Sequence, residues 1–174
     1  MSQNLSQLRK FVSPEIIFGA GCRHNVGNYA KTFGARKVLV VSDPGVIAAG
    51  WVADVEASLQ ALGIEYCLYS AVSPNPRVEE VMLGAEMYRE NHCDVIVAVG
   101  GGSPMDCGKG IGIVVAHGRS ILEFEGVDTI RVPSPPLILI PTTAGTSADV
   151  SQFVIISNQQ ERMKFSIVSK AVVP

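Results

Sequence analysis

The sequence predicts an α/β fold in which a mostly parallel sheet carries helices on both faces. Short apolar runs alternate with helical patterns in the order β-α-β-α-β-α-β-α-β, which is typical of parallel strands joined by crossover helices. The runs at 37–42, 95–99 and 137–140 contain unbroken aliphatic stretches, as expected of strands that are covered on both faces. Near the C-terminus, two further runs at 153–157 and 164–169 flank a polar stretch, which predicts a β-hairpin.

Size and composition favour one domain with a substantial core. The chain has 174 residues, of which 47% are apolar and 17% are charged, so we expect a single domain over 1–174. The net charge is −2 and no basic patch contains interleaved aromatic residues, which disfavours a nucleic-acid partner. No apolar run approaches the roughly 18 residues of a membrane span, and the N-terminus lacks the apolar core of a secretory signal. We therefore expect no membrane partner and a cytoplasmic location.

The cysteines and histidines do not form a recognisable metal or disulfide pattern. No Cys-x-x-Cys pair occurs, so core thiols are a better interpretation than disulfides or metal ligands. The histidines stand far apart in the sequence, which disfavours a metal site built from them. These residues are Cys22, Cys67, Cys93 and Cys107, with His24, His92 and His117.

The first elements are expected to be a loose lead-in over 1–13, a short strand over 15–18 and a helix over 25–33. The strand ends at a Gly-x-Gly sequence, 19–21. A dinucleotide fingerprint would need Gly or Ala where His24 stands, so a plain turn is the better interpretation.

Strand 37–42 is followed by a predicted helix over 52–62, a strand over 64–72 and a helix over 78–88. The first of these helices is indicated by apolar residues that recur on one face, and a glycine follows as a C-cap. The second shows the same periodicity before strand 95–99. The residues of the two faces are Val52, Val55, Leu59 and Leu62, then Val78, Val81, Met82, Ala85 and Tyr88.

The next helix is predicted over 103–117, although it contains Gly108, Gly110 and Gly112. Each glycine lowers helix propensity by about 1 kcal/mol relative to alanine. Small residues would let this helix pack close to the sheet. An irregular connection over 118–136 then leads to strand 137–140.

A glycine turn follows strand 95–99 and is the strongest local signal of a ligand site. Gly100, Gly101 and Gly102 carry no Cβ, so their backbone amides can approach a ligand closely. Ser103 is expected to be the N-cap of the following helix, with Pro104 at its first position and Asp106 completing a capping box. Such a helix N-terminus suits phosphate, although a tight turn without a ligand remains the alternative.

Three further loops are expected at the same carboxyl edge of the sheet, where ligands bind in folds of this kind. They are 43–45, 73–75 and 141–147. Asp43 ends a strand, from which a carboxylate can accept hydrogen bonds from ribose hydroxyls and repel a 2′-phosphate, which favours NAD over NADP. Its alternative is an ordinary Asp-Pro-Gly turn.

The side chains of two other segments are also candidates for this edge. Thr142, Thr143 and Thr146 offer hydroxyls, which could equally cap the local backbone. Lys109 lies one turn into the helix and could reach either a phosphate or solvent. A Walker A loop is excluded because Ser103 stands where its first glycine is needed.

These motifs together resemble the iron-containing (group III) alcohol dehydrogenase family. The stretch Gly-Gly-Gly-Ser-Pro-Met-Asp-Cys-Gly-Lys at 100–109 is similar to the family's Gly-Gly-Gly-Ser-x-x-Asp-x-x-Lys motif, and Pro-Thr-Thr-Ala-Gly-Thr at 141–146 also matches. Asp43, the Pro-Asn-Pro turn at 74–76 and Lys164 follow in the family's order. A Ser-Ala-Asp sequence at 147–149 departs from the family's usual Gly-Ser-Glu, which bears on subfamily and substrate.

The resemblance implies a Rossmann-like, dehydroquinate-synthase-like N-terminal domain that binds a dinucleotide over 1–174. It places Asp43 at the adenosine ribose, Asn75 near the cofactor, and Gly101, Gly102 and Ser103 at the pyrophosphate. It further implies that Thr142, Thr143 and Thr146 line the adenine and nicotinamide side and that Lys164 contacts the ribose. Asp106 belongs to the same motif and is included among the candidate cofactor residues, although capping explains it as well.

The resemblance also implies a Fe²⁺ ion, held in the family by one Asp and three His of a helical domain that this chain does not supply. We therefore expect the NAD-binding half of an enzyme that interconverts a primary alcohol and an aldehyde, itself inactive. A homodimer is a partner to consider, since a severed domain face exposes apolar surface. The alternatives are a non-catalytic nucleotide- or phosphate-binding module and a glycerol dehydrogenase-like relative.

Overall fold

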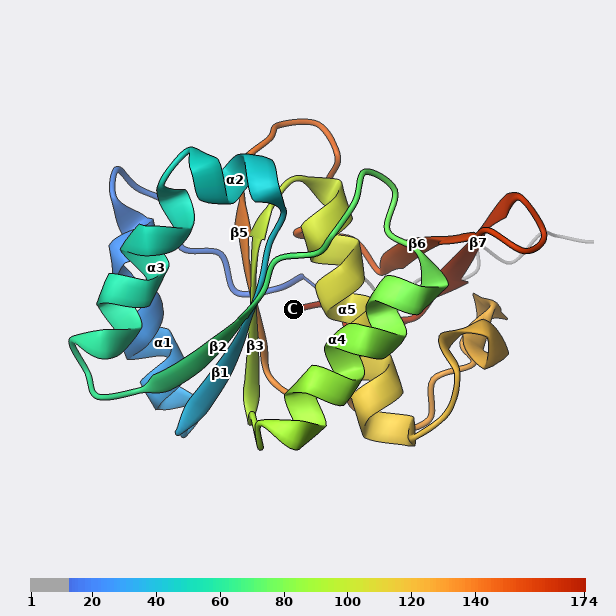
Figure 1. Cartoon of the computed structure of the whole chain (residues 1–174), viewed down its shortest axis with the longest axis horizontal. Helices are drawn as coiled ribbons and strands as arrows, with labels where there is room; N and C mark the ends of the chain where they lie inside the picture. Colours follow the sequence, from blue (N-terminus) through green and yellow to red (C-terminus); the bar gives the residue numbers. More distant parts are fainter. Residues whose placement is uncertain (1–12) are drawn as a thin grey trace, which may run out of the picture.

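A computed structural model describes residues 13–174, which form an α/β fold with a parallel main sheet and a smaller mixed sheet beside it (Figure 1). The helices are α1 (Val26–Thr32), α2 (Pro44–Ala48), α3 (Trp51–Gln60), α4 (Val78–Glu90) and α5 (Gly102–His117). The strands are β1 (Lys37–Val41), β2 (Glu65–Tyr69), β3 (Val95–Gly100), β4 (Gly126–Val127), β5 (Leu137–Pro141), β6 (Phe153–Asn158) and β7 (Met163–Val168). Short 3₁₀ turns span Cys22–Asn25, Ile121–Phe124 and Lys170–Val172.

The main sheet has the strand order β2-β1-β3-β5, and all of its pairs are parallel. Helices α1, α2 and α3 cover one face, and α4 and α5 cover the other (Figure 1). Consecutive residues of the central strands therefore alternate between two cores. Val38 and Val40 of β1 join the first core, which lies under α1, α2 and α3. Leu39 and Val41 join the second core, which lies under α4 and α5. The predicted α/β fold is confirmed.

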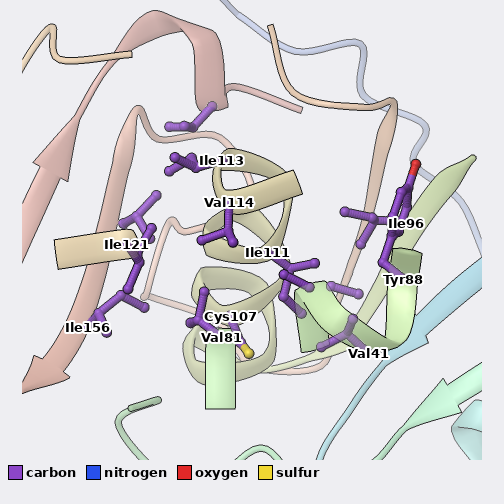
Figure 2. Packing of buried hydrophobic residues seen from close by; sticks show 14 of the residues in the cluster. Val41, Val81, Tyr88, Ile96, Cys107, Ile111, Ile113, Val114, Ile121 and Ile156 are labelled. Atoms are coloured by element: carbon purple, nitrogen blue, oxygen red, sulfur yellow. The ribbon is translucent and has the colours of Figure 1, made fainter. Parts of the chain in front are cut away.

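The second core is the larger one and joins the two sheets (Figure 2). Ile111 and Val114 of α5 are fully buried in it, together with Val81 of α4 and Ile156 of β6. The expected role of the helical glycines is seen in the same region. A Cβ on Gly108 would lie 3.0 Å from the Cβ of Ala98, so its absence lets α5 approach β3.

The mixed sheet has the order β4-β7-β6 and contains the predicted hairpin, in which β6 and β7 pair antiparallel. Its strands follow the alternating pattern of a sheet with one covered face. Val154 and Ile156 are buried, whereas Phe153 and Ile155 are 46% and 45% exposed.

Three expected features of the chain path are wrong. Residues 15–18 do not form a strand, because within the described residues they pair with no other strand and remain exposed. The Asp-Pro-Gly sequence at 43–45 opens the short helix α2 instead of a loop. The connection 118–136 is not wholly irregular, since it contains a 3₁₀ turn and β4. The lead-in expected over 1–13 lies, except for Ser13, outside the described residues.

Candidate functional site

A cleft of about 590 Å³ lies at the carboxyl edge of the parallel sheet, over the ends of β1 and β3. The chain leaves these neighbouring strands toward opposite faces, into α2 and α5 respectively. This is the topological switch point at which open α/β sheets bind ligands. The lining residues are Asp43, Pro44, Gly45, Val46, Val72, Ser73, Pro74, Gly101, Gly102, Ser103, Pro104, Thr142, Thr143, Ala144 and Thr146.

The floor of the cleft is held by hydrogen bonds that connect the strand ends. The buried Ser42 hydroxyl donates to the Val99 carbonyl at 2.8 Å and thereby joins β1 to β3. The Thr142 amide donates to the Gly100 carbonyl at 2.9 Å and extends the pairing of β3 with β5. The three strands thus present their ends at fixed positions.

The first residue of the glycine turn, Gly100, has a backbone conformation that other residues adopt only with strain. Gly100 has φ +151°, and a Cβ there would lie 2.5 Å from Cγ of Pro104. A Cβ on Gly101 would lie 3.1 Å from the Thr143 hydroxyl oxygen, and one on Gly102 would lie 3.4 Å from Thr146. The turn and the threonine loop are therefore close neighbours across the cleft. Gly100 belongs to the predicted glycine turn but not to the residues expected at the pyrophosphate, yet its φ and its contact are the most restrictive of the three glycines.

The expected cap of α5 is wrong. The helix begins at Gly102, its N-cap is Gly101, and no side chain caps it. Ser103 and Pro104 therefore lie inside the first turn, and Asp106 completes no capping box. Gly101 and Gly102 line the cleft, so the first backbone amides of α5, which have no partner inside the helix, lie beside it without a capping side chain.

Asp43 occupies the end of β1 and has two distinct carboxylate oxygens. Its Oδ1 accepts a hydrogen bond from the Val46 amide at 3.0 Å and caps α2. Its Oδ2 faces Gly100, where a Cβ would lie 3.3 Å from it. The residue therefore combines the expected turn role with an oxygen directed toward the glycine turn.

Ser103, Asn75 and Lys164 form a connected series beside the cleft, at what we call its mouth, and of the three only Ser103 lines the cleft. The Ser103 hydroxyl oxygen accepts from the backbone N–H of Asn75 at 3.1 Å, and the Asn75 side-chain oxygen accepts from Lys164 Nζ at 2.6 Å. Asn75 has φ +59°, a left-handed conformation that Asn tolerates better than most residues. Residues far apart in the sequence are thus brought beside the start of α5.

Asp106 and Lys109 lie away from the cleft, on the side of α5 that packs against β6. Lys109 is 1% exposed, and its Nζ donates to the carbonyl oxygens of Ser151 at 2.7 Å and Phe153 at 3.2 Å. The expectation that Lys109 reaches a phosphate or solvent is therefore wrong. Its distant carbonyl partners gave no local sequence signal.

The pKa values of these two groups are shifted by the same environment. Burial raises the pKa of Asp106 to about 6, an effect that Lys109 and the Ile155 backbone partly offset. Burial lowers the pKa of Lys109 to about 8, which the negative charges of Asp106 and Asp149 partly oppose.

The residues present fit a nucleotide better than a metal ion. The glycine turn leaves space that any Cβ would fill, and Ser73 at the cleft has a buried hydroxyl without a hydrogen-bond partner in residues 13–174. The sequence placed the loop 73–75 at this edge but gave no signal for the Ser73 hydroxyl itself. Within the same described range, no group of three His, Cys, Asp or Glu side chains is placed to hold a metal.

The cysteines differ from the expectation of four core thiols. Cys107 and Cys93 are buried, whereas Cys67 is half-buried and Cys22 is exposed.

No helix found between residues 13 and 174 has the length and apolar character needed to cross a membrane.

Comparisons with known proteins identify the class to which this fold belongs, the oxidoreductases. The family described as iron-containing alcohol dehydrogenase matches residues 13–174. The chain belongs to the iron-containing alcohol dehydrogenase family.

Individual relatives agree with this assignment. The chain is 40% identical over 155 residues to 1,3-propanediol dehydrogenase of Citrobacter freundii, covering 88% of this chain and 40% of the relative. A crystal structure of 1,3-propanediol oxidoreductase superimposes with a TM-score of 0.93 at 36% identity, covering 97% of this chain and 44% of that one. Sulfoacetaldehyde reductase from Bifidobacterium kashiwanohense, solved with NAD⁺, matches with a TM-score of 0.86 at 30% identity, covering 96% and 44% respectively. The chain thus spans less than half the length of these relatives.

Proposed function

We propose that this chain is the NAD-binding part of an iron-dependent alcohol dehydrogenase that interconverts a primary alcohol and an aldehyde. The observation that carries the proposal is the convergence of Asp43, the glycine turn and the threonine loop on one cleft at the switch point. NAD, when bound, would supply or accept the hydride of the reaction. Residues 13–174 show no ligand set for the metal of the family, so the tasks below concern the cofactor alone.

The cleft residues divide into groups with different tasks. Asp43 would accept hydrogen bonds from ribose hydroxyls through Oδ2, which is the oxygen not used by the Val46 cap. Gly101, Gly102 and Ser103 would bind the pyrophosphate through the amides at the start of α5. The hydroxyls of Thr142, Thr143 and Thr146 would line the opposite wall.

Two groups would act from beside the cleft. Lys164 and Asn75 hold Ser103 through the hydrogen bonds at the mouth, and the ammonium group of Lys164 would meet the ribose or phosphate of a bound dinucleotide. Asp106 does not line the cleft. It would affect the cofactor only by fixing the position of α5.

Titration with NAD, NADP and inorganic phosphate tests the proposal, with thermal shift as the readout and Trp51 fluorescence as a second signal. NAD is expected to stabilise the chain, NADP less so, and phosphate hardly at all. Asp43→Asn keeps an acceptor for the cap but loses the charge, so the ratio of NAD affinity to NADP affinity should fall about tenfold. Asp128→Asn, which changes an exposed aspartate outside the cleft, should leave that ratio unchanged.

Equal stabilisation by all three ligands would instead support a generic phosphate-binding module. Which alcohol is the substrate is a separate question, because on our proposal specificity belongs to the complete enzyme. It is tested by an activity assay on a chain of the relatives' full length. A glycerol dehydrogenase-like activity would appear in the same assay as a preference for a polyol.

A further inference from the structure

Cys67 and Cys93 form a close thiol pair outside the cleft. Their Sγ atoms are 3.4 Å apart, although the whole of α4 lies between them in the sequence. Both are free thiols. We propose that this pair is an oxidisable dithiol that closes to an intramolecular disulfide, a modification site independent of the proposed nucleotide function.

The two thiols differ in access. Cys67 lies on β2, which is an edge strand of the main sheet, and its side chain is half-buried. Cys93 is buried between the end of α4 and the start of β3. An oxidant in solution therefore reaches Cys67 first, and Cys93 reacts second, with the oxidised Cys67.

The electrostatic environment ranks the two thiols in the same order as their access does, with Cys67 the more reactive. The pKa of Cys67 is lowered, mainly by its hydrogen bond with the Cys93 thiol. Burial partly opposes this lowering, and the positive charge of Lys37 adds to it. The same hydrogen bond and burial raise the pKa of Cys93. Since the thiolate is the reactive form, Cys67 is the nucleophile of the pair.

The reaction with a peroxide balances in two steps. The Cys67 thiolate attacks one oxygen of hydrogen peroxide, forms a sulfenic acid and releases hydroxide as the O–O bond breaks. The Cys93 sulfur then attacks the Cys67 sulfur, and the S–O bond breaks to release water. The two sulfurs together lose two electrons, which reduce the peroxide. The 3.4 Å approach means that the second step needs only a small movement of either side chain.

The other cysteines provide internal controls. Cys107 is a residue of α5 and is buried in the core, and Cys22 is exposed near the start of the described residues. Neither has a sulfur partner among the hydrogen-bonded contacts of residues 13–174. Removal of the exposed thiol by Cys22→Ser therefore leaves a chain in which only Cys67, Cys93 and Cys107 remain.

The test oxidises the Cys22→Ser chain with hydrogen peroxide and counts free thiols after denaturation. The expected result is a fall from three thiols to one. Cleavage before aspartate releases residues 54–93, which contain both cysteines of the pair and no other. This fragment should be lighter by two hydrogen atoms. Further cleavage after Arg77 and Arg89 should separate the two cysteine-containing pieces only after reduction.

Single variants in the same background test the order of events. Cys93→Ser should accumulate a sulfenic acid at Cys67 that dimedone traps, and Cys67→Ser should leave Cys93 unmodified at the same peroxide concentration. Thermal melting of each variant shows that it is folded when treated. Retention of all three thiols, a link that involves Cys107, or preferential labelling of Cys93 would overturn the proposal.

Discussion

Helix α5 borders two regions that are held in place by opposite means. At its N-terminus the cleft is shaped by missing side chains, and the strictest position is Gly100 with its φ of +151°. About two turns further on, the buried side chain of Lys109 holds the segment leading into β6 through two backbone carbonyls. The first region therefore depends on backbone conformation, and the second depends on one cation. They should respond to different substitutions.

The largest expected effect is at the cleft. Gly100→Ala introduces a Cβ that would lie 2.5 Å from Cγ of Pro104, in a backbone conformation that alanine rarely adopts. We expect a loss of about 3 kcal/mol or more in the free energy of unfolding, because strain and overpacking add. Urea denaturation measures this loss.

Gly145→Ala is the matched control, because Gly145 has φ +95° but a Cβ added there would meet no heavy atom within 4 Å. Strain alone should cost about 1–2 kcal/mol at this position. Equal losses in the two variants would show that contact with Pro104 does not shape the turn.

The second effect concerns the buried cation. Lys109→Met leaves the Ser151 and Phe153 carbonyls without their donor and should cost about 2–4 kcal/mol. Lys164→Met removes an exposed contact to Asn75 and should cost less than about 1 kcal/mol. A similar cost at both lysines in urea denaturation would contradict the contrast between buried and exposed cations.

The same lysine predicts a pH dependence. The folded-state pKa of Lys109, about 8, lies below the ordinary value of 10.5, so the unfolded chain binds more protons between these values. Stability should therefore rise with pH across this window, and the rise should be absent in Lys109→Met.

A smaller effect of known sign is expected at Asp106. Its folded-state pKa, about 6, lies above the ordinary 3.8, so the stabilisation present at low pH is lost as pH rises through 6. Asp106→Asn should remove this slope and raise stability at pH 7 by about 1–2 kcal/mol, after allowance for the lost attraction to Lys109.

Asp54 is a control of opposite sign. The hydrogen bond from Arg23 lowers the pKa of Asp54, so its contribution is present at neutral pH and is lost on acidification. If Asp54→Asn and Asp106→Asn changed the pH profile in the same direction, the assignment of the Asp106 shift to burial would be wrong.

The smallest effect is expected at the mouth of the cleft. Asn75→Gly keeps a residue that tolerates φ +59° but removes the acceptor for Lys164. The free energy of unfolding should change by less than about 1 kcal/mol, because the contact is exposed. Chemical denaturation that shows a larger loss would indicate that this series of contacts supports the fold as well as the cleft.

Patterns that repeat within one element were predictable from the sequence. The aliphatic centres of β1 and β3 predicted buried strands, and the two runs that flank a polar stretch predicted the hairpin of β6 and β7. The same aliphatic signal was wrong for β5, which is only half-buried because it lies at the edge of the main sheet. The glycine turn and the threonine loop could be placed at one edge because parallel strands end together. Their contribution to nucleotide binding stays a prediction.

Features that depend on distant partners were not predictable. Lys109 looks like a surface residue until the carbonyls of Ser151 and Phe153 are brought to it. Residues 15–18 have the composition of a strand, but no described neighbour pairs with them. The cap of α5 was misplaced because Ser103 is a preferred cap residue, whereas the backbone of Gly101 already turns the chain.

The hydrogen bond from the Thr142 amide to the Gly100 carbonyl has a thermodynamic consequence for recognition. It continues the β3–β5 ladder past the last paired residues, so the two walls of the cleft begin as one rigid ribbon. A ligand that enters has little loop entropy to remove at this point, since the walls are ordered before it arrives. Affinity should then follow the contacts made, and association should proceed without a slow ordering step.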